Sequence, residues 1–165
     1  MTCSLRPVVR ADLPDVVRLV RGLAEYERLA HEFSAVEADF DALLFGPDRV
    51  AEAIIAEIPG RAPVGIALFH RTVNTFRGRI GMFLEDLFVE PDQRGNGIGL
   101  ALLRQLGRIA IERGYNNIAW SVLNWNEPAI QCYERLGAEK VADWHGRRLY
   151  GPALIALAEG ASTHG

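Results

Sequence analysis

The chain has 165 residues, a formal net charge of -3, a hydrophobic fraction of 49% and a charged fraction of 24%. This length suits a single domain over residues 1–165 with its own core, and the composition is that of a soluble globular protein. The slightly acidic balance argues against a general nucleic-acid binder, which is usually basic. No apolar run reaches the ~20 residues that span a bilayer, so we expect no membrane segment.

The two ends of the chain and its cysteines give further expectations. Residues 1–7 lack the apolar core of a signal peptide, which favours a cytoplasmic location. Residues 161–165 are expected to be a disordered tail. Cys3 and Cys132 form neither a disulfide framework nor a spacing typical of zinc sites, so we expect no metal. Cys132 is expected to be a buried structural thiol.

The first half of the chain is expected to begin with a strand and a helix. Leu5 to Val9 is a short strand that Pro7 places at a sheet edge. The helix should have Asp12 as its N-cap and Asp15 in capping-box position, and should run to about Arg28. A second helix over 35–44 and strands over 49–57 and 64–70 follow.

The second half is expected to alternate strands and helices. Residues 71–81 are typical of a polar loop or hairpin tip. The later elements are a strand over 82–89, a helix over 97–113, a strand over 117–123, a helix over 126–136 and a terminal hairpin over 141–144 and 147–150. This order, strand–helix–helix–three strands–helix–strand–helix–two strands, predicts an α/β domain with a mixed sheet.

A glycine-rich loop, Arg94-Gly95-Asn96-Gly97-Ile98-Gly99, joins the strand over 82–89 to the next helix. Such a junction aims unpaired N–H groups at one point, at the positive end of a helix dipole, where a pyrophosphate can bind. The glycine spacing matches neither the Rossmann fingerprint nor a Walker loop. A tight turn that binds nothing is the alternative from the pattern alone.

This loop resembles the Arg/Gln-x-x-Gly-x-Gly/Ala signature of the GNAT superfamily of acetyl-CoA-dependent N-acetyltransferases. Two further blocks resemble its spermidine/spermine branch, which includes thialysine acetyltransferases; they are Leu84-Glu85-Asp86-Leu87-Phe88-Val89 and Trp125-Asn126-Glu127-Pro128-Ala129-Ile130, continued by Tyr133 and Leu136-Gly137-Ala138. The resemblance is dense from Phe83 to Ala138 and thinner from Leu5 to Glu27. It implies the GNAT acyl-CoA N-acyltransferase fold with a splayed central strand, and a homodimer.

The resemblance also implies acetyl-CoA as cosubstrate. The strand before the loop would bond the pantetheine arm through its backbone, and the loop with the first helical turn would hold the pyrophosphate. The implied cofactor-binding residues are Leu87, Phe88, Val89, Arg94, Gly95, Asn96, Gly97, Ile98, Gly99, Leu100 and Asn126.

The implied reaction moves an acetyl group directly from the thioester to a primary amine, without a covalent acyl-enzyme. Glu85 matches the family carboxylate that helps to remove the amine proton, and Tyr133 matches the tyrosine general acid. The alternative for Glu85 is a salt-bridged strand glutamate. The alternative for Tyr133 is a core tyrosine, because Ile130, Tyr133 and Leu136 share one helical face.

Four residues are implied to bind the amine: Tyr26, Glu27, Glu85 and Asp86. Tyr26 and Glu27 match pocket positions of the spermidine/spermine branch. Asp86 adds an acidic neighbour, although strand alternation would turn it away from Glu85.

The stretch before this strand departs from the polyamine enzymes. It carries Arg71, Arg77 and Arg79, which would repel a polycation. A thialysine-like amino acid, or an amine that carries a carboxylate, would fit better. Acetylation of proteins or peptides, and a CoA-binding sensor without turnover, stay open as alternatives.

Overall fold

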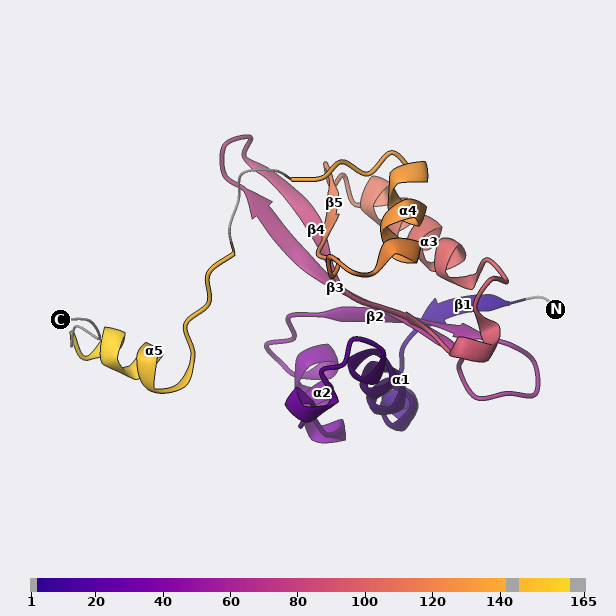
Figure 1. Ribbon diagram of the computed structural model, residues 1–165, viewed down its shortest axis with the longest axis horizontal. Coiled ribbons are helices and arrows are strands. Elements are labelled where there is room, and N and C mark those ends of the chain that lie inside the picture. Colours follow the sequence, from indigo (N-terminus) through magenta and orange to yellow (C-terminus); the bar gives the residue numbers. More distant parts are fainter. Residues whose placement is uncertain (1–2, 142–145, 161–165) are drawn as a thin grey trace. The chain divides into compact units, whose positions relative to one another are not determined.

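The computed structural model describes residues 3–141 and 146–160 (Figure 1). The chain divides into two compact units, Met1–Leu123 and Asn124–Gly165. The first unit holds a sheet and three α-helices, and the second holds two helices. Within the described residues, no helix is both long enough and apolar enough to cross a membrane.

Five strands form one mixed sheet in the order β1-β2-β3-β4-β5. Neighbours from β1 to β4 pair antiparallel, and β4 pairs parallel with β5. The strands are β1 Ser4–Pro7, β2 Glu52–Glu57, β3 Gly65–Asn74, β4 Arg79–Val89 and β5 Ile118–Trp120. The mixed α/β class and the edge position of the first strand are therefore confirmed.

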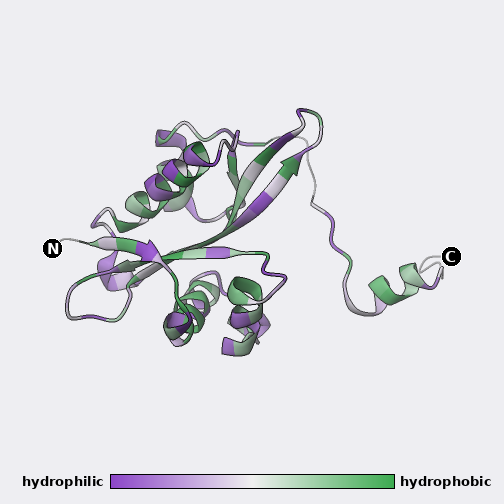
Figure 2. Ribbon diagram, turned by 180° about the vertical axis from the view of Figure 1, so that it is seen from behind, coloured by the Kyte–Doolittle hydropathy of each residue, from purple (hydrophilic) through white to green (hydrophobic). Residues whose placement is uncertain are grey.

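Helices cover both faces of the sheet (Figure 1). The α-helices are α1 Leu13–Tyr26, α2 Glu37–Phe45, α3 Ile98–Glu112, α4 Glu127–Arg135 and α5 Gly151–Ala158. One core packs α1 and α2 against the sheet through residues such as Val16, Leu19 and Ile66. A second core packs α3 against the other face through Leu102 and Leu106. Hydrophobic and hydrophilic residues alternate along α1 and α3 (Figure 2), as expected of amphipathic surface helices.

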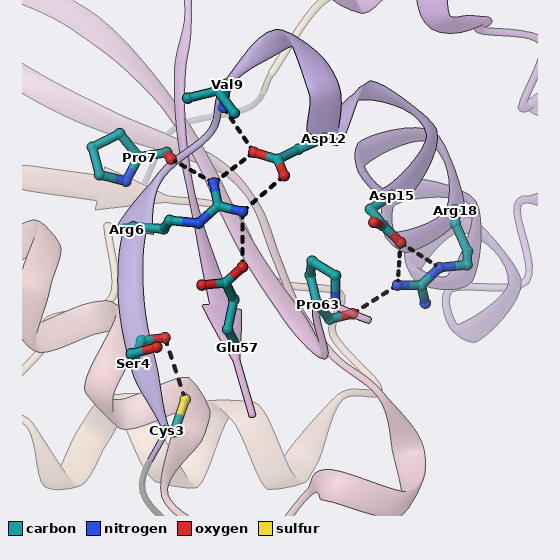
Figure 3. Close-up of polar contacts among 10 residues, drawn as sticks. All are labelled: Cys3, Ser4, Arg6, Pro7, Val9, Asp12, Asp15, Arg18, Glu57 and Pro63. Carbon is teal, nitrogen blue, oxygen red and sulfur yellow. Dashed lines mark hydrogen bonds and ion pairs between the residues drawn. The ribbon is translucent and has the colours of Figure 1, made fainter. Parts of the chain in front are cut away.

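The start of α1 differs from the prediction. A 3-10 turn, Arg10–Asp12, precedes the helix, so Asp12 has helical dihedral angles and does not cap α1 through its side chain. Its carboxylate instead accepts the Val9 N–H at 2.8 Å and pairs with Arg6 at 2.6 Å (Figure 3). Asp15 is not part of a capping box; it pairs with Arg18 at 2.8 Å.

The hairpin between β3 and β4 is longer than predicted. We expected a loop over 71–81, but β3 continues to Asn74, which pairs with Arg79 at the start of β4. Only residues 75–78 form the turn, and Gly78 has a φ of 57° there. Both strands therefore extend well beyond β2, which begins at Glu52 opposite Phe69.

The C-terminal part also differs. The predicted strand over 147–150 is wrong, because these residues have no regular secondary structure. Most of the other predicted strand, over 141–144, and the predicted tail lie outside the described residues. The helix α5 was not predicted, although Pro152 in its first turn is a typical helix-start signal.

Candidate active site

A β-bulge in β4 brings Glu85 and Asp86 to the same face of the sheet. Leu68 and Phe69 of β3 pair with Asp86 and Leu84, so Glu85 is the extra residue. Leu84 packs in the α3 core and Phe88 in the α1 core, although regular alternation over four residues would put both on one face.

The neighbours of Glu85 and Asp86 show that both lie on the face of the sheet that α1 covers, called the α1 face below. His70 follows Leu68 by two residues on β3 and therefore lies on the α1 face with it. Its Nε2 atom is 3.5 Å from Glu85 Oε2. Asp86 precedes Phe88 by two residues and shares its face. The expectation that alternation separates Glu85 from Asp86 was therefore wrong.

Asp86 is the most perturbed acid of this site. Its pKa is raised to about 6, chiefly by burial and further by the negative charges of Glu85 and Glu27. Burial also raises the pKa of Glu27, which lies just beyond the end of α1. Glu27, Glu85 and Asp86 therefore form an acidic group that attracts a cation, and Asp86 is the member whose raised pKa lies closest to neutral pH.

Arg94 connects the glycine loop to the end of α1 and to β4. Its Nε atom donates to the Val89 carbonyl at 2.9 Å. Its Cζ atom lies 4.4 Å from the ring centroid of Tyr26 and 5.5 Å from that of Phe88. The Arg94 side chain therefore binds protein groups, and one face of the Tyr26 ring is covered by a guanidinium.

The loop itself has the geometry of an anion site. Gly95 and Gly97 both have a φ of 79°, which only glycine adopts without strain. Gly97 precedes α3 without a side-chain cap, and the first intrahelical bond is from Ala101 N to Gly97 O at 2.9 Å. The N–H groups of the first turn therefore have no acceptor within the helix; they belong to Ile98, which is buried, and to Gly99 and Leu100, which are half-buried.

The edge of β4 that faces away from β3 is open beyond Leu84. Pairing with β5 covers Met82 to Leu84 and stops there, and within the described residues no other strand pairs with this edge. The Glu90 N–H donates to the Val64 carbonyl, so the backbone groups of Glu90 point toward β3. Because the direction of the backbone groups alternates along a strand, those of Phe88 also point toward β3. Leu87 and Val89 therefore present their backbone groups to the open edge, and the Arg94 side chain binds the Val89 carbonyl.

An open hollow of about 680 Å³ lies beside Glu85. It combines apolar side chains from three elements with charged groups of both signs. Its lining residues are Leu43, Arg49, Val50, Ala51, Leu68, His70, Arg71, Thr72, Val73, Ile80 and Glu85. The volume lies within the ~300–1,000 Å³ typical of small-molecule sites.

Two predicted site residues belong to the second unit. Asn126 precedes α4, and its backbone carbonyl accepts the Ile130 N–H at 3.0 Å. Tyr133 lies in α4 and is half-buried, whereas Leu136 on the predicted apolar face is 49% exposed. Cys132 is a free, half-buried thiol rather than a fully buried one.

The sequence interpretation missed His70 and Arg49 as site residues. His70 was predicted only as the last residue of the strand over 64–70, yet its position two residues after Leu68 was enough to place it on the same face. Arg49 had no such signal, because its position depends on how the segment before β2 lies against β3. No group of three or more His, Cys, Asp or Glu side chains suited to a metal occurs among the described residues.

Comparison with known proteins identifies relatives of the whole chain. The sequence profile described as the Acetyltransferase (GNAT) family matches residues 16–138. A thialysine N-epsilon-acetyltransferase from Bos taurus is 32% identical over 93% of this chain and 96% of its own length. An L-ornithine N5-acetyltransferase from Arabidopsis thaliana is 26% identical over 95% of this chain and 88% of its own.

The fold has solved counterparts as well. An integron cassette protein from V. cholerae matches with a TM-score of 0.79 and 26% identity, over 96% of this chain and 99% of that one. The resemblance to the thialysine branch, first noted in two sequence blocks, therefore extends over nearly the full chain.

Proposed function

The chain belongs to the acetyltransferase (GNAT) family, and from that premise we propose that it transfers an acetyl group from acetyl-CoA directly to a primary amine of a small cationic substrate. The observation that carries the proposal is the bulge that gathers Glu85 and Asp86 next to the open edge of β4. Acetyl-CoA, when bound, supplies an acetyl group activated as a thioester.

The residues around the loop suit a ligand with a pyrophosphate and an amide-bearing arm. Leu87 and Val89 would bond the pantetheine amides as an added strand does. Residues 94–100 would hold the pyrophosphate through their backbone N–H groups at the start of α3. Asn126 is assigned a cofactor contact by its match to the family pattern alone.

Glu85 is the proposed proton acceptor. An alkylamine has a pKa near ~10 and therefore arrives protonated, so a carboxylate must help to remove its proton. Asp86 and Glu27 would hold the ammonium group beside Glu85. His70 would orient Glu85, since its ring also binds the Arg71 carbonyl through Nδ1 at 3.1 Å and packs 5.5 Å from the Phe83 ring. Tyr26 would shape this pocket with Arg94 on its ring.

Tyr133 is the proposed general acid, which would give its proton to the departing CoA thiolate. Its support is its match to the family tyrosine. Tyr133→Phe is expected to lower turnover by about 10- to 1000-fold while acetyl-CoA binding is kept. An unchanged rate would remove Tyr133 from the mechanism.

The test of the function is an acetyl-CoA turnover screen against polyamines, thialysine, lysine, ornithine, aminoglycosides and peptides with free N-termini. Release of CoA with a small amine, and a pH optimum that Glu85→Gln shifts upward, would support the proposal. CoA binding without turnover of any acceptor would favour a sensor. Turnover of peptides alone would favour a protein acetyltransferase.

A homodimer in the cytoplasm is the proposed state of the protein. Family resemblance supports the dimer, and the β3–β4 hairpin exposes apolar side chains that a partner could cover: Val73 is 77% exposed and Phe76 is 95% exposed. Sedimentation at micromolar concentration tests the dimer, and a monomer would contradict it.

A further inference from the structure

One ring nitrogen of His70 is bound to the backbone, and the other is turned to Glu85. The Nδ1 atom lies 3.1 Å from the Arg71 carbonyl oxygen. Because a carbonyl oxygen only accepts hydrogen bonds, the proton of this bond belongs to Nδ1. In the neutral ring, Nε2 then carries a lone pair and no proton. The bond to Arg71 therefore leaves Nε2 as the nitrogen that can gain and lose a proton.

The Nε2 atom and the Glu85 carboxylate together form a place for a proton. Nε2 lies 3.5 Å from Glu85 Oε2. Without a proton between them two lone pairs face each other, whereas one proton gives an imidazolium beside a carboxylate or a neutral ring beside a carboxylic acid. The distance exceeds the roughly 2.7–2.9 Å of a charge-assisted hydrogen bond, and contacts of catalytic groups commonly tighten when the substrate binds. The two side chains are therefore suited to hold one proton as a unit.

Two contacts hold the imidazole in this position. Phe83 pairs with His70 across β3 and β4, and its ring centroid lies 5.5 Å from that of the imidazole, with 32° between the two planes. The hydrogen bond to the Arg71 carbonyl is the second contact. Together they restrict rotation of the ring, so that Nε2 stays directed at Glu85.

The hollow beside Glu85 gives a proton on His70 a way to water. Both side chains line this hollow of about 680 Å³, and that of His70 is 36% exposed. The Glu85 side chain is 55% exposed, but an amine that gives up its proton must approach this carboxylate and cover it. A proton that stays on Glu85 can return to the amine, whereas a proton passed to Nε2 can leave through the hollow.

The other charged groups of this region are less suited to carry the proton away. A guanidinium is already protonated and has no acceptor atom, which excludes the arginines that line the hollow. Asp86 and Glu27 are not among the lining residues of the hollow. In the described part of the first unit, His70 is the one basic side chain within ion-pair distance of Glu85.

We propose that His70 takes the proton of the acceptor amine from Glu85 and passes it to solvent, so that the two side chains act as a proton relay. This inference rests on the proposed amine acetyltransferase function and goes beyond the orientation of Glu85 by His70. The N–H bond of the ammonium group breaks as an O–H bond forms on Glu85. That O–H bond breaks as an N–H bond forms at Nε2, and water then takes the proton. The amine nitrogen keeps the electron pair that attacks the thioester carbonyl. His70 acts through Glu85 and is therefore a positioning residue.

His70→Gln separates the relay from orientation. Its amide N–H can still donate to Glu85, but an amide does not take up a proton. With the amine that the turnover screen finds to react fastest, kcat should fall by about 10- to 100-fold, while the Kd of CoA should change by less than about 2-fold. A kcat within about 2-fold of that of the unchanged protein would mean that His70 only orients Glu85, and would overturn the relay.

His31→Gln is the matched control. His31 also lies near a glutamate, with its Nε2 atom 3.9 Å from Glu32 Oε1, and its side chain is 73% exposed. It is not among the lining residues of the hollow. His31→Gln should therefore leave kcat unchanged, and a loss as large as that of His70→Gln would contradict a specific role for His70.

Two further measurements separate the relay from packing of the ring. In a Glu85→Gln protein, His70→Gln should change kcat by less than about 2-fold, because the relay begins at Glu85. The same loss in both backgrounds would mean that His70 acts through its packing on Phe83. Nitrogen-15 spectra of the neutral His70 ring should show the proton on Nδ1, and a proton on Nε2 would overturn the relay without reference to activity. Absence of turnover with every amine would instead overturn the proposed function together with the relay.

Discussion

The guanidinium of Arg94 lies 4.4 Å from the ring centroid of Tyr26, and its Nε atom donates to the Val89 carbonyl at 2.9 Å. One side chain thus joins the proposed pyrophosphate loop to the end of α1 and to the open edge of β4. Because these contacts fix the start of the loop, they order the backbone groups that would bind the anion.

Arg94→Met keeps most of the aliphatic stem and removes both contacts. A cation–π contact and a hydrogen bond together contribute about 1–2 kcal/mol, so CoA binding should weaken by about 5- to 30-fold. Isothermal titration with CoA measures this. Arg104→Met on the exposed side of α3 is the matched control and should leave the Kd unchanged. Equal Kd values for both variants would mean that the Arg94 contacts do not order the loop.

Asp86 gives a prediction of pH-dependent stability. Its pKa is about 6 in the folded chain, whereas the ordinary value of 3.8 applies to the unfolded chain. Between these two pH values the folded state therefore binds more protons than the unfolded state. Stability therefore falls as pH rises through this window, by up to about 3 kcal/mol for a shift of this size. Asp86→Asn removes the buried charge.

Asp86→Asn should therefore raise the free energy of unfolding at pH 8 by up to about 3 kcal/mol and should bring no such gain at pH 4, while it lowers acetylation. Urea unfolding at the two pH values measures the difference. Glu27→Gln should move the transition to lower pH, because the charge of Glu27 contributes to the raised pKa of Asp86. The same stability difference at both pH values would contradict the assignment.

Local patterns predicted the parts of the site that lie within one segment. The glycine loop depends on a left-handed turn, and the helix that follows it depends on apolar residues at helical spacing. Both patterns lie in consecutive residues from Gly95 onward. The bulge at Glu85 could not be predicted in this way, because it is a property of the register between two strands. A prediction from the alternation of side chains along β4 alone therefore placed Asp86 on the wrong face of the sheet.

The extent of the hairpin and the place of Arg49 beside the hollow were missed for a related reason. Residues beyond Phe69 and before Met82 belong to strands that are not covered by β2, so their outward side chains are polar and resemble a loop. The role of Arg49 depends on where α2 and the segment after it lie against β3, which no local pattern contains. The resemblance to the family supplied Tyr26 and Glu27, which periodicity treats as an ordinary helix end.

Gly97 and Gly107 allow the same substitution to be tested with opposite signs. Gly97 has a φ of 79° before α3, and a side chain there costs about 1–2 kcal/mol. Gly107 lies within α3, and a Cβ atom there would meet no atom within 4 Å. Gly97→Ala should lower Tm and weaken CoA binding, whereas Gly107→Ala should raise stability by about 0.5–1 kcal/mol and leave CoA binding unchanged. Unchanged CoA binding by Gly97→Ala would argue against the loop as the pyrophosphate site.

Asp12 is the acid that most clearly stabilises the fold rather than the site. It is 7% exposed, and it joins Arg6 of β1, which also binds Glu57 of β2 at 2.8 Å, to the turn before α1 (Figure 3). Its hydrogen bonds from Arg6, followed by that from Val9 N–H, hold its pKa below the ordinary value of 3.8. A lowered folded pKa contributes stability above 3.8 that is lost as pH falls through the folded value.

Asp12→Asn should therefore lower the free energy of unfolding by about 1–3 kcal/mol at pH 7, because a charged group loses its hydrogen bonds and Arg6 loses a partner. The difference should shrink as pH falls below 3.8 and through the folded pKa, where the native carboxylate itself is protonated. Asp15→Asn, which breaks an exposed pair with Arg18, should cost less than about 1 kcal/mol. Equal losses for the two variants in urea unfolding would mean that the Arg6–Asp12 pair does not fasten α1 to the sheet edge.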